Sequence, residues 1–109
     1  EAAAAGVPVI ATNWSGHLDF LSDKFLKVEY DLKSVVEKRI DGRIFVKGVQ
    51  WAEPRQESFT NAIESLRNNY KNHEETARRL KKDVNRLFSK EKICKKYDKF
   101  LLGCAKQWE

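Results

Sequence analysis

The side chains best suited to contact a ligand lie near the start of the chain, in two places. Glu1 carries a carboxylate, which can accept two hydrogen bonds from the neighbouring hydroxyls of a ribose. A glycine-containing loop follows the apolar run Val9–Thr12, and the backbone N–H groups of such a loop can hold an anion such as a diphosphate. The candidate ligand contacts are therefore Glu1, Thr12, Asn13, Ser15 and Gly16. The simpler alternative is a solvated glutamate and a loop that only turns the chain.

Other polar and aromatic residues are weaker candidates. His17 could supply a polar contact, but a lone loop histidine is more often solvated. Asp19 could act as an acid or base, but its position favours the first turn of a helix, where a negative charge suits the dipole. Trp14 and Trp51 could stack on a sugar or base, although packing is the commoner fate of tryptophan. His17 and His73 are far apart in the sequence, and the glycine patterns of phosphate and dinucleotide sites are absent. We assign no catalytic residue, no metal and no cofactor.

The local sequence predicts a scaffold for these candidates. Ala2–Ala5 are strong helix formers, and Gly6 follows where a left-handed residue would end the helix. Pro8 excludes helical continuation. Val9–Thr12 is a short, wholly apolar run, typical of a fully buried parallel strand. Its carboxyl end leads into the loop, and ligands of open α/β sheets bind at that edge.

Further elements are expected downstream. Leu18–Leu21 predicts one helical turn, and Phe25–Leu32 alternates as a strand that should pair in parallel beside Val9–Thr12. Val35–Val49 is interpreted as an inserted hairpin, because Asp41-Gly42 is a strong signal for a two-residue turn. The strand residues on either side of that turn are Ile44, Val46 and Val36.

Three helices are predicted in the remainder. Trp51–Pro54 is interpreted as the entrance to the first, which carries an apolar stripe. Asn72 with Glu75 resembles a capping box that opens the second, and Ser89 is a plausible N-cap for the third. The apolar residues expected on one side of the third helix are Ile93, Tyr97, Phe100, Leu101 and Cys104.

The fold class is therefore α/β: a partial Rossmann-like half of a doubly wound domain, with short parallel strands and an inserted hairpin followed by three helices. Residues 1–109 are expected to form a single incomplete domain. Residues 1–53 would hold the sheet and the ligand segment, with the hairpin near 35–49, and residues 54–109 the helices. Because the chain starts in mid-helix without a methionine, it is expected to be a piece of a larger protein.

Residues 1–11 also resemble a known signature. Glu1-Ala2-Ala3-Ala4-Ala5-Gly6-Val7-Pro8-Val9-Ile10-Ala11 is similar to the E-A-M-A-x-G-x-P-V-I-A pattern of retaining, nucleotide-sugar-dependent glycosyltransferases of the GT-B fold, the group 1 or family 4 set. Ala3 replaces the usual methionine at a packing position. Thr12–Gly16 and Trp51–Pro54 resemble a bacterial or viral branch of that set.

The resemblance implies the C-terminal, nucleotide-sugar-binding part of such an enzyme. The whole enzyme would transfer a hexose from a nucleoside diphosphate sugar to a carbohydrate or lipid acceptor, with retention. Glu1 matches the second of two glutamates that flank the family's glycine-rich donor loop, which implies that Glu1 contacts the ribose. The first glutamate and that loop are not in this chain. The acceptor half, an N-terminal domain of the same protein, would be the main partner, and no cofactor beyond the donor is implied.

Charge raises two other hypotheses. Residues 67–109 hold 13 Lys/Arg and 6 Asp/Glu, within a net charge of +5 for the chain. This basic tail could meet an anionic membrane surface or nucleic acid, or could be an ordinary solvated face. The residues of a nucleic-acid module would be Arg78, Arg79, Lys81, Lys82 and Lys95, but the aromatic and basic motifs of the recognised modules are absent, so nucleic acid is disfavoured. A purely structural domain is the remaining alternative.

The two cysteines bear on the compartment. Cys94 and Cys104 would lie about 15 Å apart on one helix, too far for a disulfide. They are expected to be reduced, which fits a cytoplasmic protein, peripheral at the membrane if the basic tail meets lipid. No basic segment precedes an apolar one at the start, so no signal peptide is expected.

Overall fold

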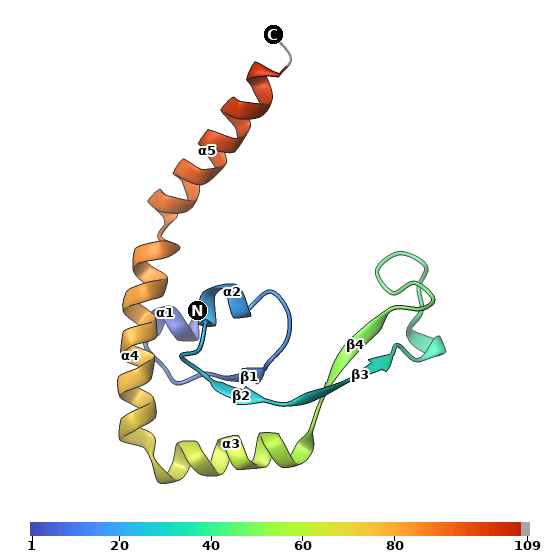
Figure 1. The fold of residues 1–109 in the computed structure, drawn as a ribbon, viewed down its shortest axis with the longest axis vertical. Helices are drawn as coiled ribbons and strands as arrows, with labels where there is room; N and C mark the ends of the chain where they lie inside the picture. Colours follow the sequence, from blue (N-terminus) through green and yellow to red (C-terminus); the bar gives the residue numbers. More distant parts are fainter. Residues whose placement is uncertain (108–109) are drawn as a thin grey trace.

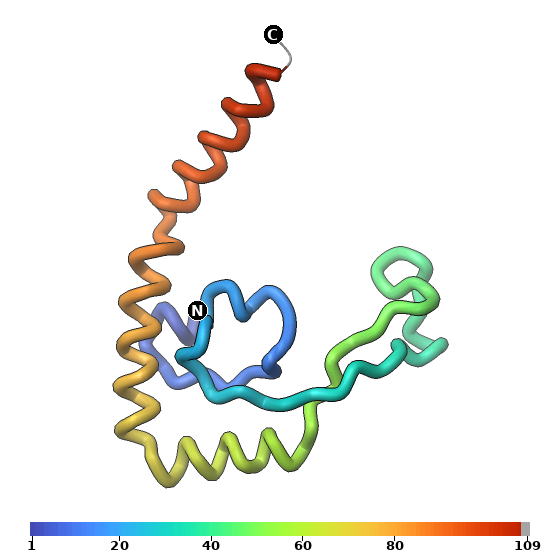
Figure 2. Tube along the Cα trace, in the orientation of Figure 1, coloured from blue at the N-terminus to red at the C-terminus, as the bar shows by residue number. Residues whose placement is uncertain are grey.

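Three long helices and two short sheets make up residues 1–107, the part of the chain that the computed structural model describes. The longest dimension is 59 Å and the radius of gyration is 18.4 Å, where a compact domain of this length has about 13 Å. Figures 1 and 2 show that the last helix and a two-stranded hairpin extend away from the other elements. The parallel pair, the antiparallel pair and the helices that follow confirm the predicted α/β fold class, which is compatible with part of a Rossmann-like domain.

The first helix, α1 (Ala2–Ala5), ends in a Schellman turn, as the sequence predicts. Gly6 has φ of 82°, and its N–H donates to the carbonyl of Ala3 at 3.1 Å, while the N–H of Val7 donates to Ala2 at 3.1 Å. Only glycine adopts this left-handed conformation without steric cost. The side chain of Lys81 also lies against the turn, since a Cβ added to Gly6 would stand 3.1 Å from Lys81 Cδ.

Two strands of three residues form the parallel pair. β1 (Ile10–Thr12) lies beside β2 (Leu26–Val28), with Ile10 opposite Leu26 and Thr12 opposite Val28, so the predicted parallel pairing is confirmed. The chain between them contains α2 (Leu18–Leu21), which carries Asp19 in its first turn as expected.

The predicted strand Phe25–Leu32 is divided at Glu29. The N–H of Glu29 donates to Ser58 Oγ at 2.9 Å, and its carbonyl accepts from the N–H of Arg55 at 2.8 Å. These bonds to the segment that begins the helical half interrupt the ladder. The chain therefore leaves the parallel pair at Val28 and enters a second sheet at Tyr30.

The second sheet is an antiparallel hairpin of β3 (Tyr30–Ser34) and β4 (Gln50–Pro54), in which Tyr30 pairs with Pro54 and Ser34 with Gln50. The predicted hairpin is thus present, but its strands flank residues 35–49 instead of lying inside them. The connection holds a turn of 3-10 helix, η1 (Glu37–Arg39), and Ile44 and Val46 lie in a loop.

The expected two-residue turn at Asp41-Gly42 is wrong for a physical reason. The carboxylate of Asp41 accepts hydrogen bonds from the backbone N–H groups of Arg43, Ile44 and Phe45, at 2.8, 2.9 and 2.9 Å. One side chain therefore satisfies three donors that a strand would pair across a ladder. Gly42 has a positive φ of 72°, so this position does favour glycine, as the sequence predicts, although the turn is of another kind.

The helical half contains α3 (Gln56–Asn68), α4 (Tyr70–Leu87) and α5 (Lys90–Lys106). Two predictions of helix starts are wrong. Trp51–Pro54 belongs to β4, and α3 begins after it at Gln56. The Asn72–Glu75 capping box does not form, because α4 begins at Tyr70, only one residue after the break at Asn69.

The start of α5 is as predicted, since Ser89 Oγ accepts a hydrogen bond from the N–H of Lys92 at 3.3 Å. Both cysteines lie on this helix and both are free thiols. Within residues 1–107, the helices are all too short or too polar to cross a membrane.

A small core holds α1, α2 and α4 together. Ala3, Leu21 and Leu80 are buried against one another, and Leu80 is only 1% exposed. The partly buried residues packed against them are Val9, Ala11, Phe25 and Val84. α3 lies against both strands of the parallel pair.

Candidate functional site

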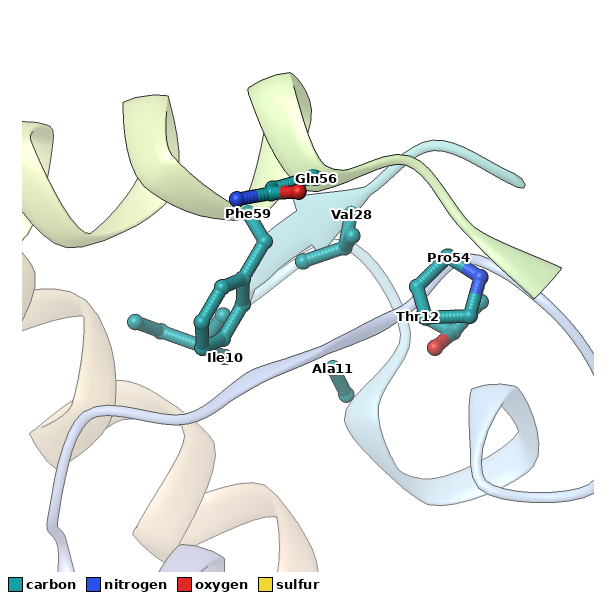
Figure 3. Close-up of a pocket in the computed structure, with 7 residues that line it drawn as sticks. All are labelled: Ile10, Ala11, Thr12, Val28, Pro54, Gln56 and Phe59. Atoms are coloured by element: carbon teal, nitrogen blue, oxygen red, sulfur yellow. The ribbon is translucent and has the colours of Figure 1, made fainter.

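A groove lies between the parallel pair and the start of α3, and it reaches the carboxyl edge of the pair at Thr12 and Val28. It encloses about 390 Å³ and is lined by Ile10, Ala11, Thr12, Val28, Pro54, Gln56 and Phe59. Figure 3 shows the ring of Phe59 beside Ile10, with the amide of Gln56 near it and Thr12 close to Pro54. Thr12 and Val28 are the last residues of β1 and β2, which is the edge where open α/β sheets bind ligands. Its walls are mainly apolar, with one amide and one hydroxyl.

The loop Asn13–His17 continues from this edge, and its shape is fixed by hydrogen bonds at its start. The N–H of Asn13 donates to the carbonyl of Val28 at 2.9 Å, and the N–H of Trp14 donates to Thr12 at 2.8 Å. Nε2 of His17 lies 2.5 Å from the same Thr12 carbonyl, so the histidine holds the loop closed. His17, interpreted from the sequence as a solvated residue, is half-buried.

The middle of the loop is exposed and conformationally unusual. Ser15 has φ of 80°, a left-handed value that is uncommon for a residue with a side chain. Within residues 1–107, no hydrogen bond is formed by the backbone N–H groups of Ser15, Gly16 and His17. Successive N–H groups around a left-handed residue form a concavity that suits an anion. The loop can therefore bind an anionic group through its backbone.

Glu1 lies at the start of α1, where its carbonyl accepts a hydrogen bond from the N–H of Ala5 at 2.9 Å. Its side chain is exposed and does not cap the helix. The Schellman turn at Gly6 reverses the chain between α1 and β1. Ala3, two residues on, packs against Leu21 of α2. Ala3 thus fixes α1 in the core, and the side chain of Glu1 stays exposed beside it.

The two candidate tryptophans lie in different places. Trp14 packs on Tyr30, with ring centroids 5.2 Å apart and planes at 55°, and remains 40% exposed. Trp51 lies on the hairpin, where it meets the edge of Phe45 at 6.2 Å and the guanidinium of Arg39 at 5.7 Å. Only Trp14 therefore belongs to the candidate site. Trp51 stabilises the connection of the hairpin, which extends away from the parallel pair (Figure 1).

Two titratable groups with perturbed pKa values belong to the scaffold of the hairpin and not to the site. Arg55 donates to both carboxylate oxygens of Asp31, with Nη2–Oδ1 at 2.6 Å, and this guanidinium holds the pKa of Asp31 below its usual range. The three backbone N–H groups on Asp41 likewise lower the pKa of that carboxyl. In residues 1–107, no three His, Cys, Asp or Glu side chains gather closely enough to hold a metal ion.

Sequence reasoning missed part of the groove. Phe59 is an apolar residue of α3, the helix for which the sequence predicts an apolar stripe, yet it is 48% exposed and lines the groove. Pro54 and Gln56 escape that reasoning, because the sequence pattern predicts Trp51–Pro54 as a helix entrance. A useful signal was Pro54 itself, since proline is tolerated at the edge of a sheet and at the residues just before a helix.

Comparison with known proteins gives one match. The model of the family described as Family 4 Glycosyltransferase in conflict systems matches residues 1–96. None of the curated proteins and none of the solved structures matches the chain. The matched residues include Glu1, the loop Asn13–His17, the groove and the hairpin, and end within α5.

Proposed function

Because the chain belongs to the family 4 glycosyltransferases of conflict systems, we propose that it forms the donor side of an enzyme that uses a nucleoside diphosphate sugar. In this proposal the enzyme has the GT-B architecture and transfers a hexose, with retention, to a carbohydrate or lipid acceptor. The acceptor side would come from an N-terminal domain of the same protein.

One observation carries the proposal: an exposed loop with free backbone N–H groups follows β1 at the carboxyl edge of a parallel pair. That edge is where nucleotides bind in open α/β sheets, and backbone N–H groups suit the diphosphate of the donor. Because Thr12 accepts from Trp14 and lies against His17, the loop keeps its shape without a ligand. A preformed loop lowers the ordering cost of binding.

Each candidate residue has a distinct role in this proposal. The carboxylate of Glu1 accepts hydrogen bonds from the ribose hydroxyls. The loop residues Asn13, Ser15 and Gly16 surround the diphosphate, and the hydroxyl of Thr12 meets the donor at the mouth of the groove. These residues bind and orient the donor. No catalytic residue is assigned within this chain, because transfer needs donor and acceptor held together across a cleft.

Replacement of Glu1 tests the proposal. A hydrogen bond to a charged group contributes about 1.5–3 kcal/mol, so Glu1→Ala should weaken binding of a nucleoside diphosphate roughly ten- to a hundredfold. Glu1→Gln keeps the shape of the side chain and part of its hydrogen bonding, so its affinity should lie between those of the unchanged chain and Glu1→Ala. Titration calorimetry with uridine, guanosine and adenosine diphosphates, and with the 2′-deoxy form of whichever binds, measures these losses.

The 2′-deoxy ligand makes the test specific. The 2′-deoxy ligand lacks one of the ribose hydroxyls that donate to Glu1. Glu1→Ala should therefore lower the affinity for this ligand less than it lowers the affinity for the normal ligand. Glu64→Ala, at an exposed position on α3, is the matched control and should leave both affinities unchanged. Equal losses for the two ligands would return Glu1 to a solvated surface role, and no binding of any nucleoside diphosphate would refute the proposed function.

A further inference from the structure

Trp14 lies in the candidate site with its ring partly exposed. It belongs to the loop Asn13–His17 and is 40% exposed, although tryptophan usually buries most of its surface. The residues that flank it in the chain, Thr12 and Asn13 before it and Ser15 after it, are those that the proposed function places against the donor. A ligand in this site therefore lies beside the exposed part of the Trp14 ring.

The position of this ring is fixed by its neighbours. The N–H of Trp14 donates to the carbonyl of Thr12 at 2.8 Å, which holds the backbone. The ring packs on Tyr30, with centroids 5.2 Å apart and planes at 55°. Tyr30 is held in turn, because it is the first residue of β3 and pairs with Pro54 of β4. Trp14 is therefore in place before a ligand binds, which lowers the ordering cost of a contact with it.

The order of groups along a nucleoside diphosphate sugar indicates which of them reaches Trp14. The ribose and the sugar are attached at opposite ends of the diphosphate. In the proposed function, Glu1 binds the ribose and the loop binds the diphosphate. In Figure 1 the loop between β1 and α2 lies between the N-terminus and the hairpin. A donor whose ribose lies toward Glu1 therefore extends its sugar toward the hairpin, where Trp14 packs on Tyr30.

We propose that the ring of Trp14 packs against the sugar of the donor, the group that is transferred; this inference rests on the proposed function. A pyranose has C–H groups on its faces and hydroxyl groups around its rim. A flat aromatic ring covers the apolar face and leaves the hydroxyl groups free for polar partners. Trp14 thus recognises the sugar, while Glu1 and the loop recognise the nucleoside diphosphate.

Two other contacts for Trp14 predict different results. A nucleobase also stacks on aromatic rings, but it is joined to the ribose and therefore lies at the Glu1 end of the donor. The acceptor domain of the same protein would cover Trp14 without any help from the donor. With a base contact, replacing Trp14 weakens a nucleoside diphosphate and its sugar derivative equally. With a domain contact, it weakens neither of them in this chain.

Calorimetric titration with matched pairs of ligands tests the proposal. The pairs are uridine diphosphate glucose with uridine diphosphate, guanosine diphosphate mannose with guanosine diphosphate, and adenosine diphosphate glucose with adenosine diphosphate. For the pair that binds, Trp14→Ala should weaken the sugar derivative roughly three- to tenfold and the plain diphosphate much less. Trp14→Phe keeps a flat ring and should restore most of the loss. Equal losses within the pair, or no loss for either ligand, would overturn the proposal.

Two further variants control for the fold. Trp51→Ala removes the tryptophan of the hairpin, which contacts Phe45 and Arg39, and should leave both affinities unchanged. Tyr30→Ala removes the support under Trp14 and should reproduce part of the loss for the sugar derivative, whereas Tyr30→Phe should not. Circular dichroism shows whether each variant keeps its helices.

Fluorescence tests the contact without replacing Trp14. In a chain with Trp51→Phe and Trp108→Phe, Trp14 is the remaining tryptophan. At saturation the sugar derivative should change its emission more than the plain diphosphate does, and equal changes would count against the contact.

The contact and the proposed function can fail separately. If the diphosphates bind but Trp14→Ala affects both ligands of a pair equally, the donor site remains and only the role of Trp14 is lost. If no ligand of the three pairs binds, the proposed function is refuted and the role of Trp14 with it.

Discussion

Replacing Gly6 with alanine tests how the turn after α1 positions the donor edge. Gly6 holds φ of 82°, and a Cβ there would lie 3.1 Å from Cδ of Lys81. A residue with a side chain in the left-handed region costs about 1–2 kcal/mol. The stem of Lys81 can move because the residue is exposed, so the close contact should add less than the conformation does. Gly6→Ala should therefore lower the free energy of unfolding by roughly 1–2 kcal/mol.

Two other glycines separate the contributions. Gly42 has φ of 72° but no atom within 4 Å of an added Cβ, so Gly42→Ala reports the conformational cost alone. Gly16 has neither a positive φ nor a neighbour within 4 Å. Gly16→Ala should leave stability unchanged or raise it slightly, because alanine restricts the unfolded chain.

Urea denaturation followed by circular dichroism measures the series. Adding Lys81→Ala to Gly6→Ala should recover the part of the loss that comes from the contact, and only that part. The reasoning is refuted if Gly6→Ala is no more destabilising than Gly16→Ala. If Gly6→Ala and Gly42→Ala lower the free energy of unfolding equally, and Lys81→Ala restores none of it, the contact between the added Cβ and Lys81 costs no stability.

Three further outcomes are expected. Leu80→Ala, which empties the most buried position of the core, should destabilise the protein by about 2–5 kcal/mol in the same denaturation assay, whereas Leu80→Met should cost much less. Because hydrogen bonds lower the pKa of Asp41, its contribution is complete above the ordinary aspartate pKa of about 4 and is lost as pH falls below it. The protection factors of the amide hydrogens of residues 43–45, which correct for the slower intrinsic exchange at acid pH, should therefore fall as the pH is lowered, and Asp41→Ala should lower them at neutral pH. Arg55→Lys removes the two-pronged contact with Asp31, so the pKa of Asp31, followed by carboxyl NMR, should rise toward its ordinary value.

Elements whose ends depend on neighbouring residues could be predicted from the sequence. The glycine after Ala2–Ala5, the proline after it and the apolar run to Thr12 specify a helix, a turn and a strand through local sterics alone. Ser89 similarly begins α5 through a bond to a residue three positions on. The resemblance of residues 1–11 indicated the family for the same reason, since one short stretch carries the motif.

Elements that depend on residues far away in the chain could not be predicted from the sequence. Trp51–Pro54 forms a strand because Tyr30–Ser34 lies opposite, about twenty residues away in the chain, and no local pattern records that pairing. The groove has the same origin: Phe59 and Gln56 reach it only because α3 packs over the parallel pair. The two-residue turn at Asp41-Gly42 was wrong for another reason. The sequence does not show which backbone N–H groups donate to the carboxylate of Asp41.

The core has a consequence for the order of folding. Ala3 comes from the first helix and Leu80 from α4, so the contact between them closes a loop of most of the chain. Loop closure over such a distance is slow, whereas an isolated helix forms within about a microsecond. Synthesis runs from α1 toward α5, so α1, β1 and α2 emerge before α4 and lack the packing of Leu80 until it follows. The donor edge therefore remains unformed on the ribosome until α4 has left the exit tunnel.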